Sequence, residues 1–174
     1  GEIINWNTRE ILHSQVLNPD VLPYMYRCAK EHGFAIVTYR DNNVITETPD
    51  DEYVIKEATL NRMQTLQVSN FLEYIDFPIP KCLIVGEPER LHQLEIEMHS
   101  HLKETNEVYR SEPYFLELVP KGIDKAQSLA VLLEKTGIRR EEVIACGDGF
   151  NDLSMIKFAG LGVAMQNAQP IVRE

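Results

Sequence analysis

The chain has 174 residues, 44% of them hydrophobic, which is enough for one ordinary domain or two small ones with a buried core. Its 27 acidic and 17 basic side chains give a net charge of −10, and no Lys/Arg-rich run relieves it, so we expect no nucleic-acid partner and no membrane partner. Three widely spaced cysteines, no long apolar run and no signal-like start predict a cytoplasmic protein.

Hydrophobic periodicity and turn signals predict mixed helices and strands up to residue 119. The clearest helix starts at Asn18-Pro19-Asp20, which offers an N-cap, a proline and an early acid, and it runs to about His32 before Gly33. The other expected elements, in chain order, are a hairpin over 2–13, two antiparallel strands over 34–39 and 44–46, a helix over 51–62, an extended stretch over 63–69, a short helix over 70–76, a strand over 81–86, a helix over 87–103, and strands over 107–110 and 114–119.

Three histidines on the expected helix over 87–103 raise the question of a metal site. His99 and His101 point to different faces of a helix, and no acid–histidine strand pattern accompanies them or His92. We therefore expect a solvated helix face and assign these histidines no role.

The character of the chain changes near its last third. From Pro120 onward the pattern is helix, strand, helix and strand, which is typical of a parallel sheet with covering helices. We place a domain boundary near residue 112, where hairpins give way to alternating strands and helices.

A lysine stands in an unusual place at the start of the next helix. Asp124 and Gln127 have the spacing of a capping box, so Lys125 falls in the first helical turn. The helix dipole disfavours a cation there by roughly 0.3–1 kcal/mol. Either Lys125 reaches into solvent, or it is kept there to bind an anion together with free backbone N–H groups.

Two acids follow the next predicted strand. Residues 143–147 indicate a buried strand, and Asp148 and Asp152 lie in the glycine turn between it and a helix. Carboxylates at the carboxyl end of a strand suggest Mg²⁺, although Asn151 and Asp152 are also ordinary helix-start residues. Parallel topology brings Lys125 to the same sheet edge, so the combination favours phosphoryl transfer.

The same turn also suggests a dinucleotide-binding domain, because Gly147 and Gly149 lie between a strand and a helix. Asp152 stands at the position of the third glycine of that motif, and its charge would repel a pyrophosphate. The dinucleotide interpretation is therefore the weaker one.

Three stretches together resemble the haloacid dehalogenase superfamily, and within it the Cof-type sugar-phosphate phosphatases of subfamily IIB. They are Leu116–Ala126, Gly147–Asp152 and Gly162–Ala168. The resemblance implies an α/β fold, in which a partial Rossmannoid parallel-sheet core (1–16 and 113–174) carries an inserted α/β cap domain of the C2B type (17–112).

The resemblance also implies a role for each candidate residue. Lys125 would be the catalytic lysine that contacts the phosphate and the nucleophile, and Asn151 would help to bind the phosphate. Asp148 would be a ligand of Mg²⁺, and Asp152 would lie in or just behind the metal shell. Lys121 is a second nearby lysine, but its distance from the helix start makes it the less favoured one.

The family's nucleophile motif, a DxDGT-like strand end, is missing from these residues. Asp41, Asp50 and Asp51 have the wrong spacing, and Thr8 and Ser14 cannot be assigned to the family's Ser/Thr position. We therefore expect a carboxyl-terminal piece, inactive alone, of a magnesium-dependent phosphatase that hydrolyses small phosphorylated metabolites through an aspartyl-phosphate. The alternative is a non-catalytic binding or interaction module. The sequence leaves the oligomeric state open.

Overall fold

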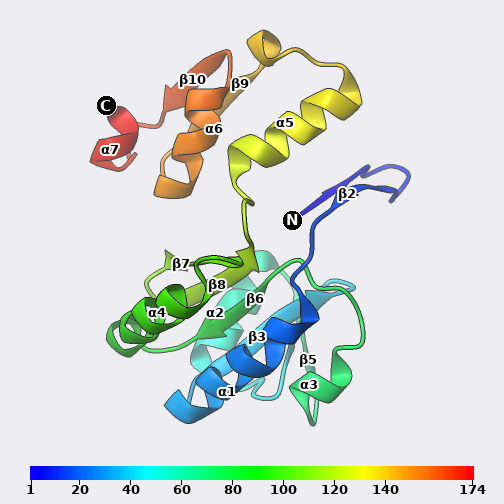
Figure 1. Ribbon diagram of the computed structural model, residues 1–174, viewed down its shortest axis with the longest axis vertical. Coiled ribbons are helices and arrows are strands. Elements are labelled where there is room, and N and C mark those ends of the chain that lie inside the picture. The colour runs from blue at the N-terminus through cyan, green and yellow to red at the C-terminus, as the bar shows by residue number, and fades with distance from the viewer. The chain divides into compact units, whose positions relative to one another are not determined.

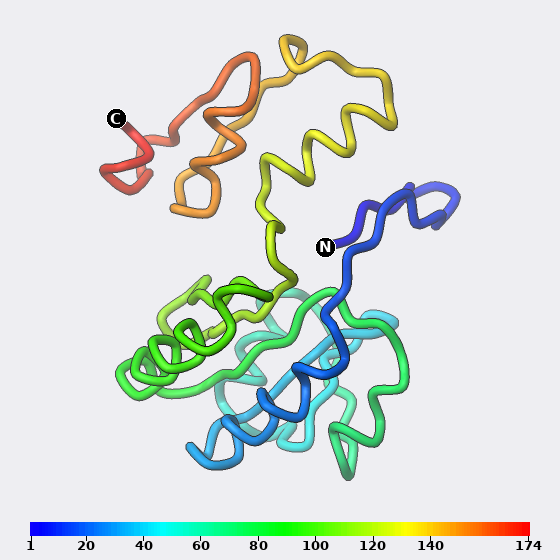
Figure 2. The backbone as a smooth tube through the Cα atoms, in the orientation of Figure 1, coloured from blue at the N-terminus to red at the C-terminus, as the bar shows by residue number.

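The computed structural model describes residues 1–174 and divides them into two compact units. The inserted unit comprises residues 15–121, and the terminal unit comprises residues 1–14 and 122–174. Figure 2 follows the chain out of the terminal unit after the first hairpin, through the whole inserted unit, and back again. The chain of the terminal unit is therefore interrupted by the inserted unit.

The inserted unit is built on a six-stranded sheet with the order β5-β4-β3-β6-β8-β7 (Figure 1). Its strands are β3 (Ala35–Arg40), β4 (Asn43–Thr46), β5 (Gln64–Gln67), β6 (Cys82–Val85), β7 (Asn106–Glu112) and β8 (Phe115–Pro120). Its helices are the short 3₁₀ turn η1 (Pro19–Val21), α1 (Leu22–His32), α2 (Glu52–Asn61), α3 (Phe71–Tyr74) and α4 (Pro88–Leu102). Neighbouring strands are antiparallel except β4 and β5, which are parallel and joined through α2.

Alternating side chains of this sheet form a core on each face. Ile36 of β3 belongs to the larger cluster, which contains Leu94 and Met98 of α4 and residues of α1. Val37, one residue further along β3, belongs to the smaller cluster with Val54 of α2. The side-chain period of two along a strand explains why neighbouring residues enter different clusters. No helix of the structure is both long enough and apolar enough to cross a membrane.

Local turn chemistry accounts for several element ends. The side chain of Asn18 accepts a hydrogen bond from the Asp20 backbone N–H at 3.1 Å, and Gly33 ends α1 with a left-handed φ of 68°. Asp41 and Asn42 have φ values of 50° and 63° between β3 and β4. Two consecutive residues with positive φ match the right-handed twist of a tight hairpin, which explains why this connection is so short.

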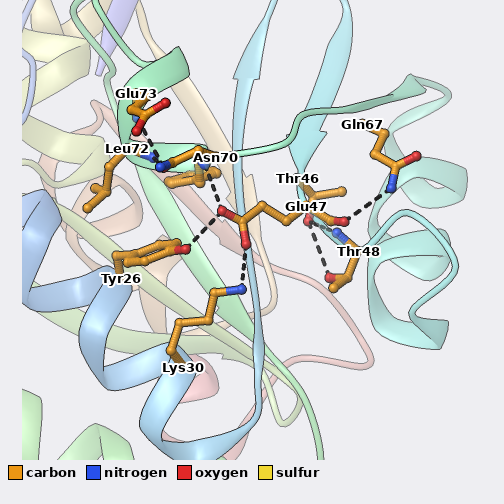
Figure 3. Close-up of polar contacts among 10 residues, drawn as sticks. Tyr26, Lys30, Thr46, Glu47, Thr48, Gln67, Asn70, Leu72 and Glu73 are labelled. Carbon is orange, nitrogen blue, oxygen red and sulfur yellow. Dashed lines mark hydrogen bonds and ion pairs between the residues drawn. The ribbon is translucent and has the colours of Figure 1, made fainter.

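A nearly buried carboxylate connects several elements of the inserted unit. The Glu47 side chain follows β4, is 14% exposed, and accepts hydrogen bonds from the Tyr26 hydroxyl (2.9 Å), the Phe71 backbone N–H (2.7 Å) and the Lys30 ammonium. Figure 3 shows Tyr26 and Lys30 reaching this carboxylate from α1. Burial by itself would raise the pKa of Glu47, but these hydrogen bonds outweigh burial and hold the pKa below its ordinary value. Glu47 therefore stays ionised and ties α1 and α3 to the end of β4.

The terminal unit contains the hairpin β1 (Glu2–Ile4) and β2 (Ile11–Ser14), followed after the insertion by alternating helices and strands. The later elements are α5 (Lys125–Thr136), η2 (Arg140–Glu142), β9 (Ile144–Gly147), η3 (Phe150–Asp152), α6 (Leu153–Phe158), β10 (Leu161–Ala164) and α7 (Pro170–Arg173). Strands β9 and β10 are parallel, which confirms the predicted strand–helix–strand order.

Strand β9 differs from its prediction as a buried strand. Ile144 is 66% exposed and Cys146 is exposed, whereas Ala145 is buried. Parallel strands are normally covered on both faces, but within this chain β9 belongs to a two-stranded sheet with β10. The apolar run signalled a strand correctly and could not reveal which of its faces is covered here.

The predicted boundary near residue 112 is wrong. Strand β8 pairs with β6 on one side and with β7 on the other, so residues up to Lys121 belong to the inserted unit, as do Gln15 and Val16. The sequence changes character at Pro120 because β8 ends there, and the preceding hairpin is part of the earlier sheet.

Candidate functional site

The turn after β9 is organised around the buried side chain of Asp152. This residue is 6% exposed, and its Oδ2 accepts hydrogen bonds from the backbone N–H groups of Asp148 (3.0 Å) and Gly149 (3.1 Å). A Cβ on Gly147 would lie 2.4 Å from the Asp152 Cβ, so only glycine leaves room for this close approach. The carboxylate thus turns back onto the loop instead of capping α6.

Lys125 reaches the same carboxylate from the first turn of α5. The Asp124 side chain caps that helix by accepting a hydrogen bond from the Gln127 backbone N–H at 2.7 Å, as expected. The Lys125 ammonium donates to Oδ1 of Asp152, 27 residues further along the chain. The structure therefore brings together the lysine and one of the two acids that the sequence predicts at a common sheet edge.

This arrangement keeps Asp152 ionised. Burial alone would raise its pKa, but hydrogen bonds from Lys125 and from the N–H groups of Gly149 and Asp148 hold the pKa below its ordinary value. The carboxylate in turn compensates a cation that the helix dipole would otherwise disfavour. The lysine is held in place while roughly half of its side chain remains exposed.

Asp148 has a different environment. It is exposed, and its Oδ2 accepts a hydrogen bond from the side-chain amide of Asn167 at 2.6 Å. Its backbone carbonyl also accepts from the Gln169 N–H at 2.9 Å, so the segment after β10 supports the turn twice. Asn167 lies in the third stretch that resembles the family, Gly162–Ala168, but the sequence predicts no role for it. The only available signal was that stretch itself, because the contact joins residues 19 positions apart.

The remaining predicted residues lie as follows. Asn151 is exposed in η3, and its Oδ1 lies 2.8 Å from where a Cβ on Gly149 would be. Lys121 belongs to the inserted unit, where its ammonium pairs with Glu107 at 3.0 Å. The two lysines therefore form ion pairs with different partners, Lys121 with Glu107 and Lys125 with Asp152.

The two acids differ in how well they suit a metal ion. Mg²⁺ is commonly held by one or two carboxylates together with water and substrate oxygens. Both oxygens of Asp152 already accept hydrogen bonds, whereas Asp148 presents an exposed carboxylate at the strand end. Asp148 therefore has the more accessible carboxylate for a cation, whereas the carboxylate of Asp152 is engaged by Lys125 and by the loop backbone. The chain contains no group of three or more acidic, histidine or cysteine side chains that could enclose a metal.

The turn is poorly suited to a dinucleotide. A pyrophosphate in such a site is held by free backbone N–H groups of the glycine turn. Here the N–H groups of Asp148 and Gly149 both donate to Asp152. A negative charge already occupies the place that the ligand would take.

An α/β domain whose parallel strand ends in an acidic turn, with a lysine fixed beside it, has the parts of a phosphoryl-transfer site. The family model described as haloacid dehalogenase-like hydrolase matches residues 1–174, and the chain belongs to this family. This confirms the resemblance seen in the sequence.

Individual relatives give the same result. A crystal structure of a haloacid dehalogenase-like hydrolase from Bacteroides thetaiotaomicron is 54% identical with a TM-score of 0.94, and the match covers 99% of this chain and 65% of that chain. The Bacillus subtilis protein YxeH is 31% identical over 175 residues, covering 98% of this chain and 63% of YxeH. HMP-PP phosphatase from Enterobacter is 28% identical over 163 residues, covering 92% of this chain and 58% of that enzyme. The chain thus spans less than two thirds of the length of each of these relatives.

Proposed function

We propose that the protein containing this chain is a magnesium-dependent phosphomonoester hydrolase of the Cof type. The observation that carries the proposal is the Lys125–Asp152 ion pair beside the exposed Asp148 at the carboxyl end of β9. Its substrate would be a small phosphorylated metabolite such as a sugar phosphate. Similarity to an enzyme named HMP-PP phosphatase supports this substrate class.

Lys125 and Asn151 would bind the phosphate directly. An ammonium has three N–H donors, so Lys125 can keep its contact with Asp152 and still donate to a phosphate oxygen. This positive charge would stabilise the negative charge of the transferring group. The exposed amide of Asn151 would be a further donor to the phosphate.

Asp148 would hold Mg²⁺, and Asn167 would orient the carboxylate by donating to its second oxygen. When bound, Mg²⁺ supplies charge neutralisation and orients the phosphoryl oxygens. Asp152 would act indirectly, since it fixes both Lys125 and the backbone of Asp148.

The nucleophile would be an aspartate of the parent protein outside these 174 residues. Its carboxylate would attack phosphorus and expel the alcohol, and water would then hydrolyse the aspartyl-phosphate. The relatives are longer than this chain, so a parent protein of similar length would contain further residues that include this aspartate. Three apolar side chains of β9 and β10 are exposed in this chain, namely Ile144, Leu161 and Val163. Parallel strands are normally covered on both faces, so a further part of the parent protein would cover these side chains.

The inserted unit would be the cap that selects the leaving group. We also place the protein in the cytoplasm, because its three cysteines are free thiols, as suits a reducing compartment.

The experiment compares two lysines in the full-length protein. Lys125→Ala should lower kcat/KM for p-nitrophenyl phosphate by about 10²–10³-fold, as expected when a donor to the transition state is removed. Lys121→Ala, which removes an ion pair of the inserted unit, should leave kcat/KM within about threefold of the wild-type value. Near-normal turnover of a folded Lys125→Ala protein would refute the proposal. The 174-residue chain alone should show no enzyme-like turnover, and a full-length protein inactive on a broad phosphate-ester panel would favour the binding module instead.

A further inference from the structure

The two edges of the six-stranded sheet are protected to different degrees. At the β7 edge, Glu95 of α4 accepts hydrogen bonds from the Arg110 backbone N–H (3.2 Å) and from the Arg110 guanidinium (2.7 Å). The β7–β8 register also shifts between Arg110 and Glu112, which marks a bulge. Charges, a bulge and an occupied edge N–H are the devices by which proteins keep another strand from pairing with a sheet edge.

The β5 edge has none of these devices. All four of its residues, Gln64–Gln67, are exposed, and residues 63–72 contain no charged side chain. The Gln64 N–H donates to the carbonyl of Asn42, just before β4, and the Val68 N–H donates to the carbonyl of Thr46 at the end of β4. Backbone groups alternate along a strand, so Thr65 and Gln67 direct their N–H and C=O groups away from β4.

We propose that the β5 edge is a pairing surface for a second copy of this chain. A chain with a net charge of −10 repels its own copies over most of its surface, so close approach is easiest where the edge is neutral. A charged partner finds no opposite charge on this edge. The β5 edge of a second copy, in contrast, presents the same backbone N–H and C=O groups, which can pair with those of the first. Identical patches that meet about a two-fold axis are the commonest way in which proteins form dimers.

One antiparallel register satisfies the outward groups of both copies. With the two-fold axis at Leu66, Thr65 lies opposite Gln67 of the second copy, and the reverse pair lies on the other side of the axis. Each pair exchanges two backbone hydrogen bonds. The two Leu66 side chains then meet as a non-hydrogen-bonded pair with Cα atoms about 4.5 Å apart. The six-stranded sheets of the two copies become one continuous sheet.

The contact is small, so the dimer is a weak and reversible one. Only four residues of each copy take part in the strand pairing, and Leu66 is 36% exposed before association. Interfaces of this size belong to the transient class. Dimerisation should therefore increase with protein concentration, and it should also increase with salt, because salt screens the repulsion between two chains of net charge −10.

A cysteine cross-link tests both the surface and the register. In full-length protein carrying Cys146→Ser, which removes the exposed cysteine of this chain, Leu66→Cys should give a disulfide-linked dimer under mild oxidation. A Cα separation of about 4.5 Å lies within the range that a disulfide spans. Gln64→Cys is the matched control: it lies on the same face of the strand, but in this register its two copies are roughly 13 Å apart, at about 3.3 Å per residue. Equal cross-linking of both variants, or none at position 66, would overturn the proposal.

Sedimentation velocity of uncross-linked protein provides the independent measurement. Wild-type protein should shift toward dimer as its concentration rises to about 1 mM, the range of weak association. Thr65→Pro removes an outward N–H, which an edge strand tolerates, and should reduce the dimer fraction at least about tenfold. Leu66→Lys should have the same effect by placing like charges opposite each other. A wild-type protein that stays monomeric at every concentration, or folded variants that associate like the wild type, would contradict the proposal.

Discussion

Replacing Glu47 with glutamine should destabilise the inserted unit mainly at neutral pH. The Glu47 carboxylate accepts hydrogen bonds from the Tyr26 hydroxyl (2.9 Å), from the Phe71 backbone N–H (2.7 Å) and from the Lys30 ammonium. A hydrogen bond to a charged group contributes about 1.5–3 kcal/mol, while the half-exposed Lys30 adds less because solvent screens it. Glutamine keeps one acceptor oxygen and faces the remaining donors with an amide N–H₂. We therefore expect the free energy of unfolding to fall by about 2–4 kcal/mol at pH 7.

The pH dependence of the free energy of unfolding tests whether the charge of Glu47 is the cause of this stabilisation. The pKa of Glu47 is lower in the folded protein than in the unfolded chain, where it is about 4.3. Its stabilisation is therefore complete above the unfolded pKa and is lost as the pH falls through the folded pKa. Urea unfolding followed by far-UV circular dichroism should show the difference between wild type and Glu47→Gln shrinking toward about 1 kcal/mol at pH 3. Glu31→Gln, an exposed change on α1, should stay within about 0.5 kcal/mol of wild type at each pH. A difference for Glu47→Gln that is constant from pH 7 to pH 3 would refute this reasoning.

Three other substitutions test the turn and the caps. Gly147→Ala places a Cβ 2.4 Å from that of Asp152, so the folded full-length protein should lose at least about tenfold in kcat, and unaltered kcat would show that the carboxylate can move freely. Asn167→Ala removes the donor to Asp148, and the Mg²⁺ concentration for half-maximal activity should rise by about 10–100-fold; the same half-maximal concentration as wild type would argue against orientation by Asn167. Asp51→Ala removes the side-chain cap of α2 and should lower the free energy of unfolding by about 0.5–2 kcal/mol without altering kcat, which thermal unfolding and steady-state assays would measure.

Local signals in the sequence were sufficient for much of the fold. The caps at Asn18 and Asp124 and the stop at Gly33 act within one helical turn, so the helix ends they predict are found in the structure. The parallel order of the last elements also followed from their alternation. Because parallel strands end at the same edge, the meeting of Lys125 with an acid 27 residues away could be predicted without coordinates.

Features that depend on distant partners could not be predicted. Strand β8 was assigned to the wrong unit because its pairing with β6 joins residues far apart in sequence. The exposure of Ile144 depends on what covers β9, which an apolar run does not specify. In the site, the residue types were visible, but the backward turn of Asp152 onto two backbone N–H groups depends on the close approach at Gly147. The family resemblance left open whether Asp152 would contact a metal or lie just behind it.

The central claim is that Asp148 holds the metal of a phosphatase site, and its most direct test is the Mg²⁺ dependence of Asp148→Asn in the full-length protein. The substitution keeps the size of the side chain and removes the charge, so kcat/KM should fall at least about 10²-fold and half-saturation should need much more Mg²⁺. Asp124→Asn is the matched control, because asparagine also caps helices and this residue lies on the same unit. That control should keep wild-type kcat/KM and the wild-type Mg²⁺ requirement. An Asp148→Asn protein with wild-type turnover and wild-type Mg²⁺ dependence would contradict the account.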